Sequence, residues 1–220
     1  MRTLSSVLAV LSLCVLAQAG LAQDAAQARK DLQAIKANYD AGTTLQADVA
    51  LEIKFAEQPA EVQRGRIEQD GERYRVEFDQ QVVISDGATV WMYLPDNREV
   101  QVYDAADGAA EGGFMRPQDF LTIYDNDGFD YAVVGEVQEG GKTYRQIEFK
   151  PLDRDSEYAK VRLTYDAAAA TVRRVKVFNK DGSRFTLSLE GLRTGVALAP
   201  ERFTFRAQDY PGVSVEDMRL

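Results

Sequence analysis

Apolar and polar side chains alternate along most of this chain, which is the pattern of β-strands that bury one face. The longest example starts at residue 45, and every second residue as far as residue 55 is apolar. The same period of two recurs at residues 74–78, 129–137, 158–165 and 185–189. Further strands are expected at residues 143–150 and 171–178, a more polar one at 62–69, and a final short one at 202–205.

Residues 81–104 contain three short β-type runs that are separated by two tight-turn signals. The first signal is Asp86-Gly87, and an Asp-Gly pair between apolar runs favours a hairpin because glycine accepts a positive φ. The middle run carries the chain's one tryptophan, Trp91, and its neighbour Val90 makes the opposite face apolar as well. We therefore expect this strand to lie in a packed core or to line something apolar.

Two segments have the spacing of amphipathic helices. In residues 24–39, Leu32, Ile35 and Tyr39 fall on one stripe. A second, short helix is expected to open at Pro117, where the missing N–H costs nothing. Its apolar side consists of Phe120, Leu121 and Tyr124. A short helix within an otherwise β chain is typical of a cover over a barrel end or a cavity.

These elements predict a mainly β fold with two or three helices, in which about ten or eleven antiparallel strands form a sandwich or a barrel. Most strands present one large apolar face, while only two short helices are available to cover those faces. If the sheet curls, the apolar faces meet inside it. A self-filled core and a ligand cavity are both compatible with this pattern.

Residues 1–22 have the features of a cleaved signal peptide, which leaves one domain at residues 23–220. Arg2 precedes an uncharged apolar run that is too short to span a bilayer, and small residues permit cleavage after Ala19 or Ala22. We therefore expect export to a bacterial periplasm.

The only cysteine, Cys14, lies inside this segment. The alternative is that lipid is attached to Cys14 and the protein is a membrane-anchored acceptor of another molecule. This attachment requires a small residue where Leu13 stands. The mature chain is thus expected to contain no disulfide.

The chain carries 35 acidic and 26 basic residues, and loss of Arg2 brings the net charge near −10. This balance argues against nucleic acid and against anionic lipid surfaces as partners, since both need a basic footprint. The absence of histidine excludes Ser-His-Asp and Cys-His catalysis and the usual zinc sites. Asp125 and Asp127 are candidates for a hydrolase carboxylate pair, although a solvated loop explains them better. We expect no enzyme activity, no cofactor and no metal.

Two motifs resemble those of the LolA-like periplasmic lipoprotein carriers. The first is SDGATVWMY at residues 85–93, followed by Pro95-Asp96 and a valine-rich strand. The second is FTF at residues 203–205, followed by PGVSVED at residues 211–217. Their order and spacing match over essentially the whole mature chain.

The resemblance implies a half-open antiparallel β-barrel, with the N-terminal helix and the short middle helix acting as a lid. It implies a monomeric carrier that takes acylated lipoproteins from an ABC-type release complex of the inner membrane to an outer-membrane acceptor. The lid helix would consist of residues around Pro117, Phe120, Leu121 and Tyr124. The cavity would be lined by Leu51, Ile53, Phe55, Val76, Phe78, Trp91, Tyr93, Phe120, Leu121, Tyr124 and Leu187. Which face of residues 89–94 contributes is left open.

The chain departs from the family pattern at one place. Members of the family carry an arginine between the second and third strands that hydrogen-bonds the lid. Here that place is a turn, with Arg66, Arg73 and Arg75 only nearby, so a latch must differ. A related lipid-binding, glycolipid-binding or lipid-sensing domain of the same fold is the alternative function.

Overall fold

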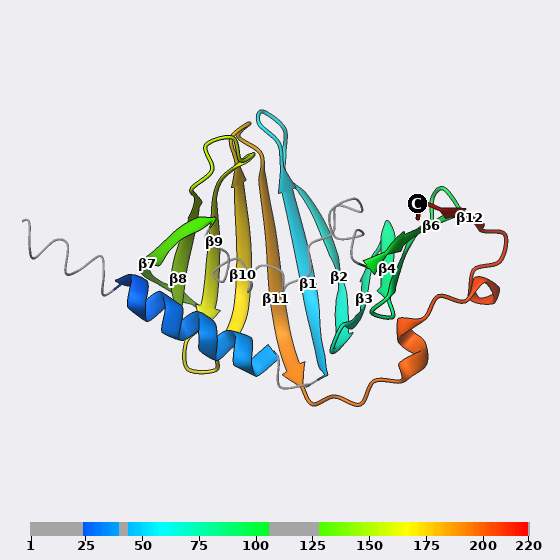
Figure 1. Ribbon diagram of the computed structural model, residues 1–220, viewed down its shortest axis with the longest axis horizontal. Coiled ribbons are helices and arrows are strands. Elements are labelled where there is room, and N and C mark those ends of the chain that lie inside the picture. Colours follow the sequence, from blue (N-terminus) through cyan, green and yellow to red (C-terminus); the bar gives the residue numbers. More distant parts are fainter. Residues whose placement is uncertain (1–23, 40–43, 106–127, 220) are drawn as a thin grey trace, which may run out of the picture.

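The computed structural model describes residues 24–39, 44–105 and 128–219, and it is mainly β (Figure 1). Residues 24–39 form the N-terminal helix. The first strands are β1 (Leu45–Lys54), β2 (Glu61–Asp70), β3 (Arg73–Phe78), β4 (Gln81–Ser85), β5 (Thr89–Leu94) and β6 (Glu99–Asp104). They are followed by β7 (Phe129–Glu139), β8 (Lys142–Pro151), β9 (Tyr158–Asp166), β10 (Thr171–Asn179) and β11 (Arg184–Thr194). The last elements are the 3₁₀ helices η2 (Pro200–Phe203) and η3 (Ala207–Asp209) and the strand β12 (Ser214–Asp217).

All twelve strands belong to one sheet in the order β12-β6-β5-β4-β3-β2-β1-β11-β10-β9-β8-β7. Neighbouring strands are antiparallel except at one edge, where β12 pairs with β6 in parallel. Among the described residues β7 and β12 are the edges, so the sheet is not closed into a barrel. None of the helices formed by the described residues has the length and apolarity needed to span a bilayer.

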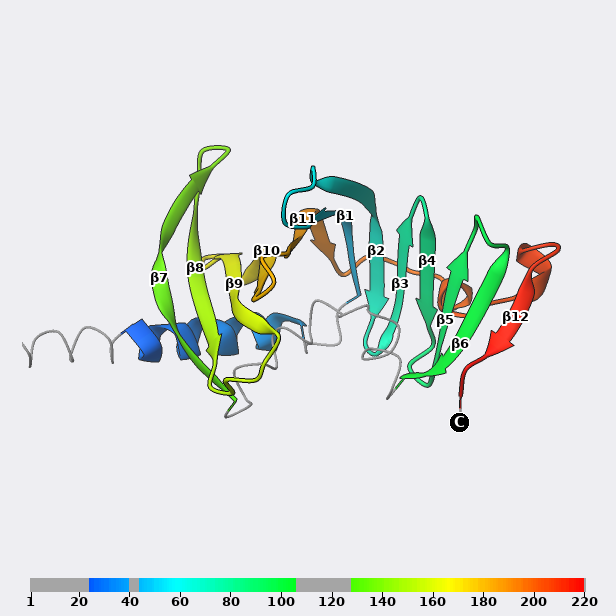
Figure 2. The ribbon, with the colours of Figure 1, turned by 90° about the horizontal axis from the view of Figure 1, so that it is seen from above.

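The sheet is bent, and its two ends form wings on either side of β10, β11 and β1 (Figure 2). Register shifts occur between Gln46 and Asp48, between Val133 and Gly135, and between Val172 and Arg174. Such bulges bend a strand and increase its twist. The N-terminal helix lies across β7–β10 (Figure 1). We call the face of the sheet against which it packs the inner face, and the opposite one the outer face.

The alternation read from the sequence decides which side chains lie on the inner face. In β1, Leu45, Ala47 and Val49 are buried on that face, while Asp48 between them is exposed on the outer face. Burying apolar surface contributes about 25 cal/mol per Å². The inner face is therefore where most of the core lies.

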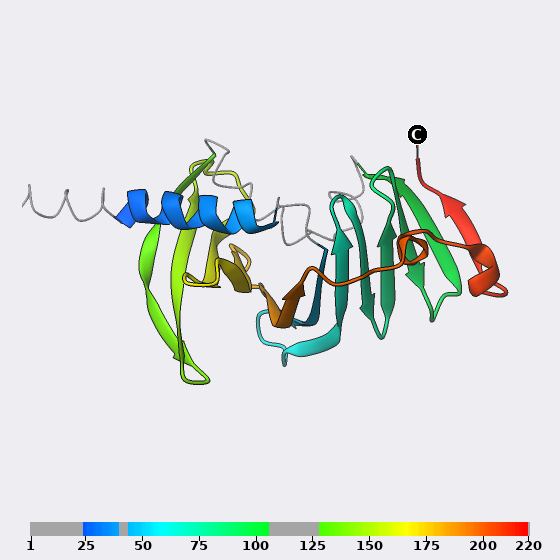
Figure 3. The same cartoon turned by 90° about the horizontal axis from the view of Figure 1, so that it is seen from below.

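The chain after β11 takes a different course. It runs along the sheet past β2–β6 and ends with β12 beside β6 (Figure 3). The first turn of this segment is η2, which starts at Pro200 and contacts β3 and β4. We call residues 195–219 the C-terminal segment.

The predicted strands are confirmed with two exceptions. Residues 202–205 were expected to be a strand, but residues 200–203 form η2, because Pro200 favours a helical first turn and Phe203 turns inward to a buried position. Residues 214–217 form the missed strand β12, and all four are exposed, so they lack the alternation that signals a strand. The expectation of a wholly antiparallel sheet is wrong at this strand alone.

The predicted N-terminal helix is confirmed at residues 24–39. The predicted signal peptide and the middle helix around Pro117 lie outside the described residues. The short helices η2 and η3 are additional.

Candidate functional site

The inner face is one apolar surface that continues from strand to strand. Leu51 and Ile53 of β1 lie opposite Leu187 and Phe185 of β11, and these pair in turn with valines of β10. On the other side of β1 the apolar row continues from Ile67 through further strands. Directly opposite residues of antiparallel strands point to the same side of a sheet. The face therefore presents aliphatic side chains across both wings.

The N-terminal helix covers part of this surface with an apolar stripe. Ala28, Leu32 and Ile35 have no exposed surface and belong to the same core cluster as the inner-face residues. Their spacing of three and four residues places them on one side of the helix. Tyr39 continues the stripe, and burial raises the pKa of its hydroxyl to about 12.

One carboxylate lies within the stripe. Asp31 accepts hydrogen bonds from the hydroxyl of Tyr165 at 2.6 Å and from Nη1 of Arg145 at 3.1 Å. Burial raises the pKa of Tyr165, and the hydrogen bond to Asp31 raises it further, because ionisation would place two negative charges together. This polar contact joins the helix to β8 and β9.

Two more contacts hold the helix at its ends. Nδ2 of Asn38 donates to the backbone oxygen of Ala170 at 3.1 Å, and the guanidinium of Arg29 lies 5.9 Å from the ring centre of Tyr131. All these partners belong to β7–β9 and the turn after β9. The helix is thus held mainly by its apolar stripe and by a few separate polar contacts.

The predicted lining residues of β1, β3 and β11 lie on the inner face. Val76 and Phe78 are buried there, and Leu51, Ile53 and Leu187 are half-buried. Their positions are consistent with the alternation of each strand. Phe55 follows the end of β1, is 46% exposed and meets the ring of Phe185 edge to face at 6.4 Å.

The two predicted residues of β5 lie on the opposite face. Trp91 stacks on Phe205 at 6.4 Å, and Tyr93 lies against Tyr210 at 4.6 Å, so both rings are covered by the C-terminal segment. The inner face of β5 is formed by its other residues, including Val90, which is buried. The structure therefore decides which face of β5 belongs to the inner face. Trp91 and Tyr93 lie on the outer face and do not line the same surface as Val76.

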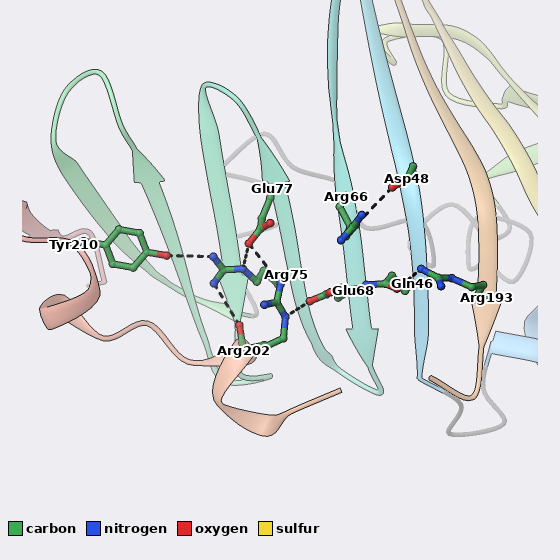
Figure 4. Close-up of polar contacts among 9 residues, drawn as sticks. All are labelled: Gln46, Asp48, Arg66, Glu68, Arg75, Glu77, Arg193, Arg202 and Tyr210. Atoms are coloured by element: carbon green, nitrogen blue, oxygen red, sulfur yellow. Dashed lines mark hydrogen bonds and ion pairs between the residues drawn. The ribbon is translucent and has the colours of Figure 1, made fainter. Parts of the chain in front are cut away.

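Arg66 of β2 and Arg73 and Arg75 of β3 also face outward, and Figure 4 shows Arg66 and Arg75. Arg75 pairs with Glu77 and donates from Nη2 to the hydroxyl of Tyr210 at 3.3 Å. Arg66 pairs with Asp48 at 3.5 Å. Arg73 pairs with Asp70 and lies 5.4 Å from the ring centre of Phe203. Arg73 and Arg75 therefore contact the C-terminal segment.

On the same outer face lies the buried carboxylate of Glu68, whose side chain is 6% exposed. It pairs with Arg202 of η2 and accepts a hydrogen bond of 2.7 Å from Nε2 of Gln46 (Figure 4). The backbone oxygen of Arg202 accepts a hydrogen bond from Arg75 at 3.5 Å. Together these contacts join the C-terminal segment to β2 and β3.

The remaining predicted residues lie outside the described residues: Pro117, Phe120, Leu121, Tyr124, Asp125 and Asp127. Asp31 was missed by sequence reasoning, although it follows Ala28 by three residues and so falls on the same stripe. In the part of the chain that the structure describes, no cluster of three or more acidic or metal-ligating residues has the arrangement of a metal site.

Two of the clefts lined by described residues open on the sheet, and both have mixed or polar walls. One of about 610 Å³ lies between the β7–β8 and β9–β10 turns and the end of β11, with Tyr144, Val172 and Leu189 beside charged residues. The other, of about 540 Å³, lies on the outer face between β2 and β8. The apolar side chains of the inner face are instead packed together in the core.

Comparisons with known proteins agree with this architecture. The family model described as "Outer membrane lipoprotein carrier protein LolA" matches residues 69–206 of the 220. A comparison with curated protein sequences finds no significant match.

Solved structures with this arrangement are distant in sequence. An uncharacterized conserved protein from Thermus thermophilus is similar with a TM-score of 0.57 at 15% identity, over 88% of this chain and 99% of that one. The lipoprotein LppX of Mycobacterium tuberculosis gives 0.46 at 10% identity, over 78% and 98%. A LolA superfamily protein from Nitrosomonas europaea gives 0.42 at 12% identity, over 80% and 97%. The first of these likenesses shows a shared fold.

Proposed function

Because this chain belongs to the family of the outer membrane lipoprotein carrier protein LolA, we propose that it is a periplasmic carrier of acylated lipoproteins. In this role it binds acyl chains against the inner face of the sheet. It receives them from a release complex in the inner membrane and delivers them to an acceptor in the outer membrane. It performs no chemical reaction on its cargo.

One observation carries the proposal: a continuous apolar face extends across the sheet, and part of it lies beneath a helix that packs on it with an apolar stripe. Leu51, Ile53 and Leu187 form the middle of that face and are only half-buried. An acyl chain needs a long aliphatic surface and no hydrogen-bonding partner. The inner face offers such a surface across several strands.

The free energies of burial favour displacement of the helix by a bound acyl chain. Burying one methylene contributes about 0.8 kcal/mol, so a long acyl chain gains roughly 10 kcal/mol on leaving water. Exposing Leu32 and Ile35 costs about 3–6 kcal/mol together. Acyl binding therefore exceeds the cost of moving the helix, and that cost weakens the binding enough for release.

Cross-linking from matched positions tests the proposal. A photoreactive residue placed at Ile53, on the inner face, is expected to capture lipoproteins labelled with radioactive palmitate in periplasm. The neighbouring Lys54 points to the outer face and serves as the control. Equal labelling from both positions, or none from Ile53, would contradict the proposal.

Lipid extraction identifies the cargo directly. Protein purified from the native periplasm is extracted with organic solvent and the extract analysed by mass spectrometry. Triacylated lipoprotein is expected. An extract that contains only glycolipid or free fatty acid would replace the lipoprotein role by another lipid-binding role on the same face.

A further inference from the structure

The cleft of about 540 Å³ on the outer face has a regular floor. It is made by two adjacent rows of residues that cross the sheet from β2 to β8. The first row is Arg64, Ala50, Ser188, Arg174, Thr164 and Gln146. The second row is Val62, Glu52, Thr186, Lys176 and Arg162. Side chains from six strands therefore converge on one polar hollow.

The floor is positively charged although the chain as a whole has a net charge of −9. Four lining residues are basic, and Glu52 is the one carboxylate among the described residues of the lining. Arg174 is neutralised by Glu139, with two contacts of 2.9 and 3.0 Å. Arg162 shares Glu148 with Lys160, at 2.7 and 2.9 Å. The charges of Arg64 and Lys176 remain against the single negative charge of Glu52, which leaves a surplus of one positive charge in the lining.

Arg64 and Lys176 pair with no carboxylate in the described part of the chain. Lys176 contacts only the ring of Phe178, at 5.4 Å from the ring centre. Lys160, Arg162 and Arg184 lie around the same ring at 5.1–5.9 Å. A positive potential thus extends from the cleft into the next row of the sheet.

Two buried polar atoms of the second row lack a hydrogen-bond partner within the described residues. They are Nε of Arg162 and Oγ1 of Thr186, and the latter residue is only 8% exposed. A buried polar group without a partner destabilises the folded state. Nε of Arg162 can only donate, but neither atom has exposed surface, so neither is a direct contact for a ligand in the cleft. Lys176 stands between the two in the same row.

We propose that this cleft is a binding site for a phosphate group, presented by a soluble phosphate ester or by the headgroup of a phospholipid. A phosphate offers several acceptor oxygens and negative charge, which match the unpaired cations Arg64 and Lys176. The volume leaves room for the glycerol or sugar that carries the phosphate. The site lies on the opposite face from the acyl-binding surface and does not depend on it.

Binding of small phosphates tests the site in the full mature protein. At low ionic strength, glycerol 3-phosphate and inorganic phosphate are expected to give saturable heat in calorimetry and to raise Tm. Sodium sulfate at equal ionic strength serves as the anion control. Heat of the same size with sulfate, or an adventitious ion effect without saturation, would overturn a phosphate site.

Matched variants locate the binding. Arg64→Gln with Lys176→Gln removes the two unpaired charges and is expected to weaken binding at least tenfold. Arg193→Gln removes one charge from the outer face beyond the cleft and is expected to bind as the wild type. Circular dichroism verifies that each variant is folded. Equal weakening in both variants would show general charge attraction and overturn the proposal.

Vesicle flotation distinguishes the two sources of phosphate. Phosphatidylglycerol vesicles are compared with phosphatidylcholine vesicles, using wild type and the double variant. Selective flotation of the wild type with phosphatidylglycerol assigns a headgroup, while binding of glycerol 3-phosphate without flotation assigns a soluble ester. Saturable binding to neither overturns the site, and this outcome leaves the palmitate cross-linking at Ile53 unaffected.

Discussion

The N-terminal helix and the C-terminal segment cover opposite faces of opposite wings of one sheet. The helix covers the inner face of β7–β10 with the fully buried residues Ala28, Leu32 and Ile35. The C-terminal segment covers the outer face of β2–β6 with Phe203 and a series of ring and arginine contacts.

The two covers differ in how they are held. The helix contacts the sheet through one apolar stripe, and in the proposed carrier role it leaves the sheet as one unit. The C-terminal segment is joined at successive points to β2, β3 and β5 and ends as a strand hydrogen-bonded to β6. A cover that must open for a ligand needs to be held in the way the N-terminal helix is held. The arrangement of the C-terminal segment suits a permanent clamp, and Trp91 lies beneath this clamp and not on the proposed acyl-binding face.

The largest expected effect on stability comes from removing the buried ring of Phe203, which anchors the C-terminal segment. Phe203→Ala should lower the free energy of unfolding by about 4 kcal/mol, since a fully buried ring is removed and a cavity remains. Chemical denaturation measures the loss. Phe205→Ala, at a half-buried ring of the same segment, is the comparison and should cost only about 1–2 kcal/mol. Equal losses would show that the clamp has no buried anchor.

Loosening the helix should have two effects of opposite sign. Leu32→Ala should lower the free energy of unfolding by about 3 kcal/mol. It should also bind a fluorescent fatty acid about tenfold more tightly, because less contact must be broken when the helix leaves. Titration of the fluorescence measures this affinity. Phe203→Ala should leave the affinity unchanged, and a similar gain there would contradict the division into lid and clamp.

The polar contacts of the C-terminal segment are expected to contribute less to the free energy of unfolding than the buried ring of Phe203 does. Arg202→Ala should cost about 2 kcal/mol, because Glu68 then stays buried with Gln46 as its remaining partner. Arg66→Ala breaks an exposed pair of the same face and should cost about 0–1 kcal/mol. Both values are read from urea unfolding, and a larger loss for Arg66→Ala would reverse the ranking.

The smallest expected loss of folding stability is the one at alkaline pH, and it comes from a phenol buried at the N-terminal helix. Burial holds the pKa of Tyr39 at about 12, so the unfolded chain ionises this phenol near pH 10 while the folded chain keeps the proton. The stability is complete below pH 10 and is lost as the pH rises towards 12, by about 1 kcal/mol at pH 11. Tyr39→Phe should reduce this slope in pH-dependent unfolding and leave the part that comes from Tyr165, whose pKa is also raised by burial, whereas Phe203→Ala should retain the full slope.

Much of the fold follows from local pattern. The alternation in β1 places Leu45 inward and Asp48 outward, and the stripe of Leu32 and Ile35 contacts the inner face. The resemblance to lipoprotein carriers is confirmed by the match over residues 69–206. A strand such as β12 carries no comparable signal, because it is exposed and is defined by its hydrogen bonds to β6.

The sequence by itself determined the strands β1–β11, the helix stripe and the family, because period and motif are properties of neighbouring residues. Only the tertiary structure decided which face of β5 is covered by the C-terminal segment, since both faces are apolar and periodicity cannot choose between them. The same holds for the cleft on the outer face. Arg64 and Lys176 are far apart in the chain, and the register of six strands brings them to one hollow.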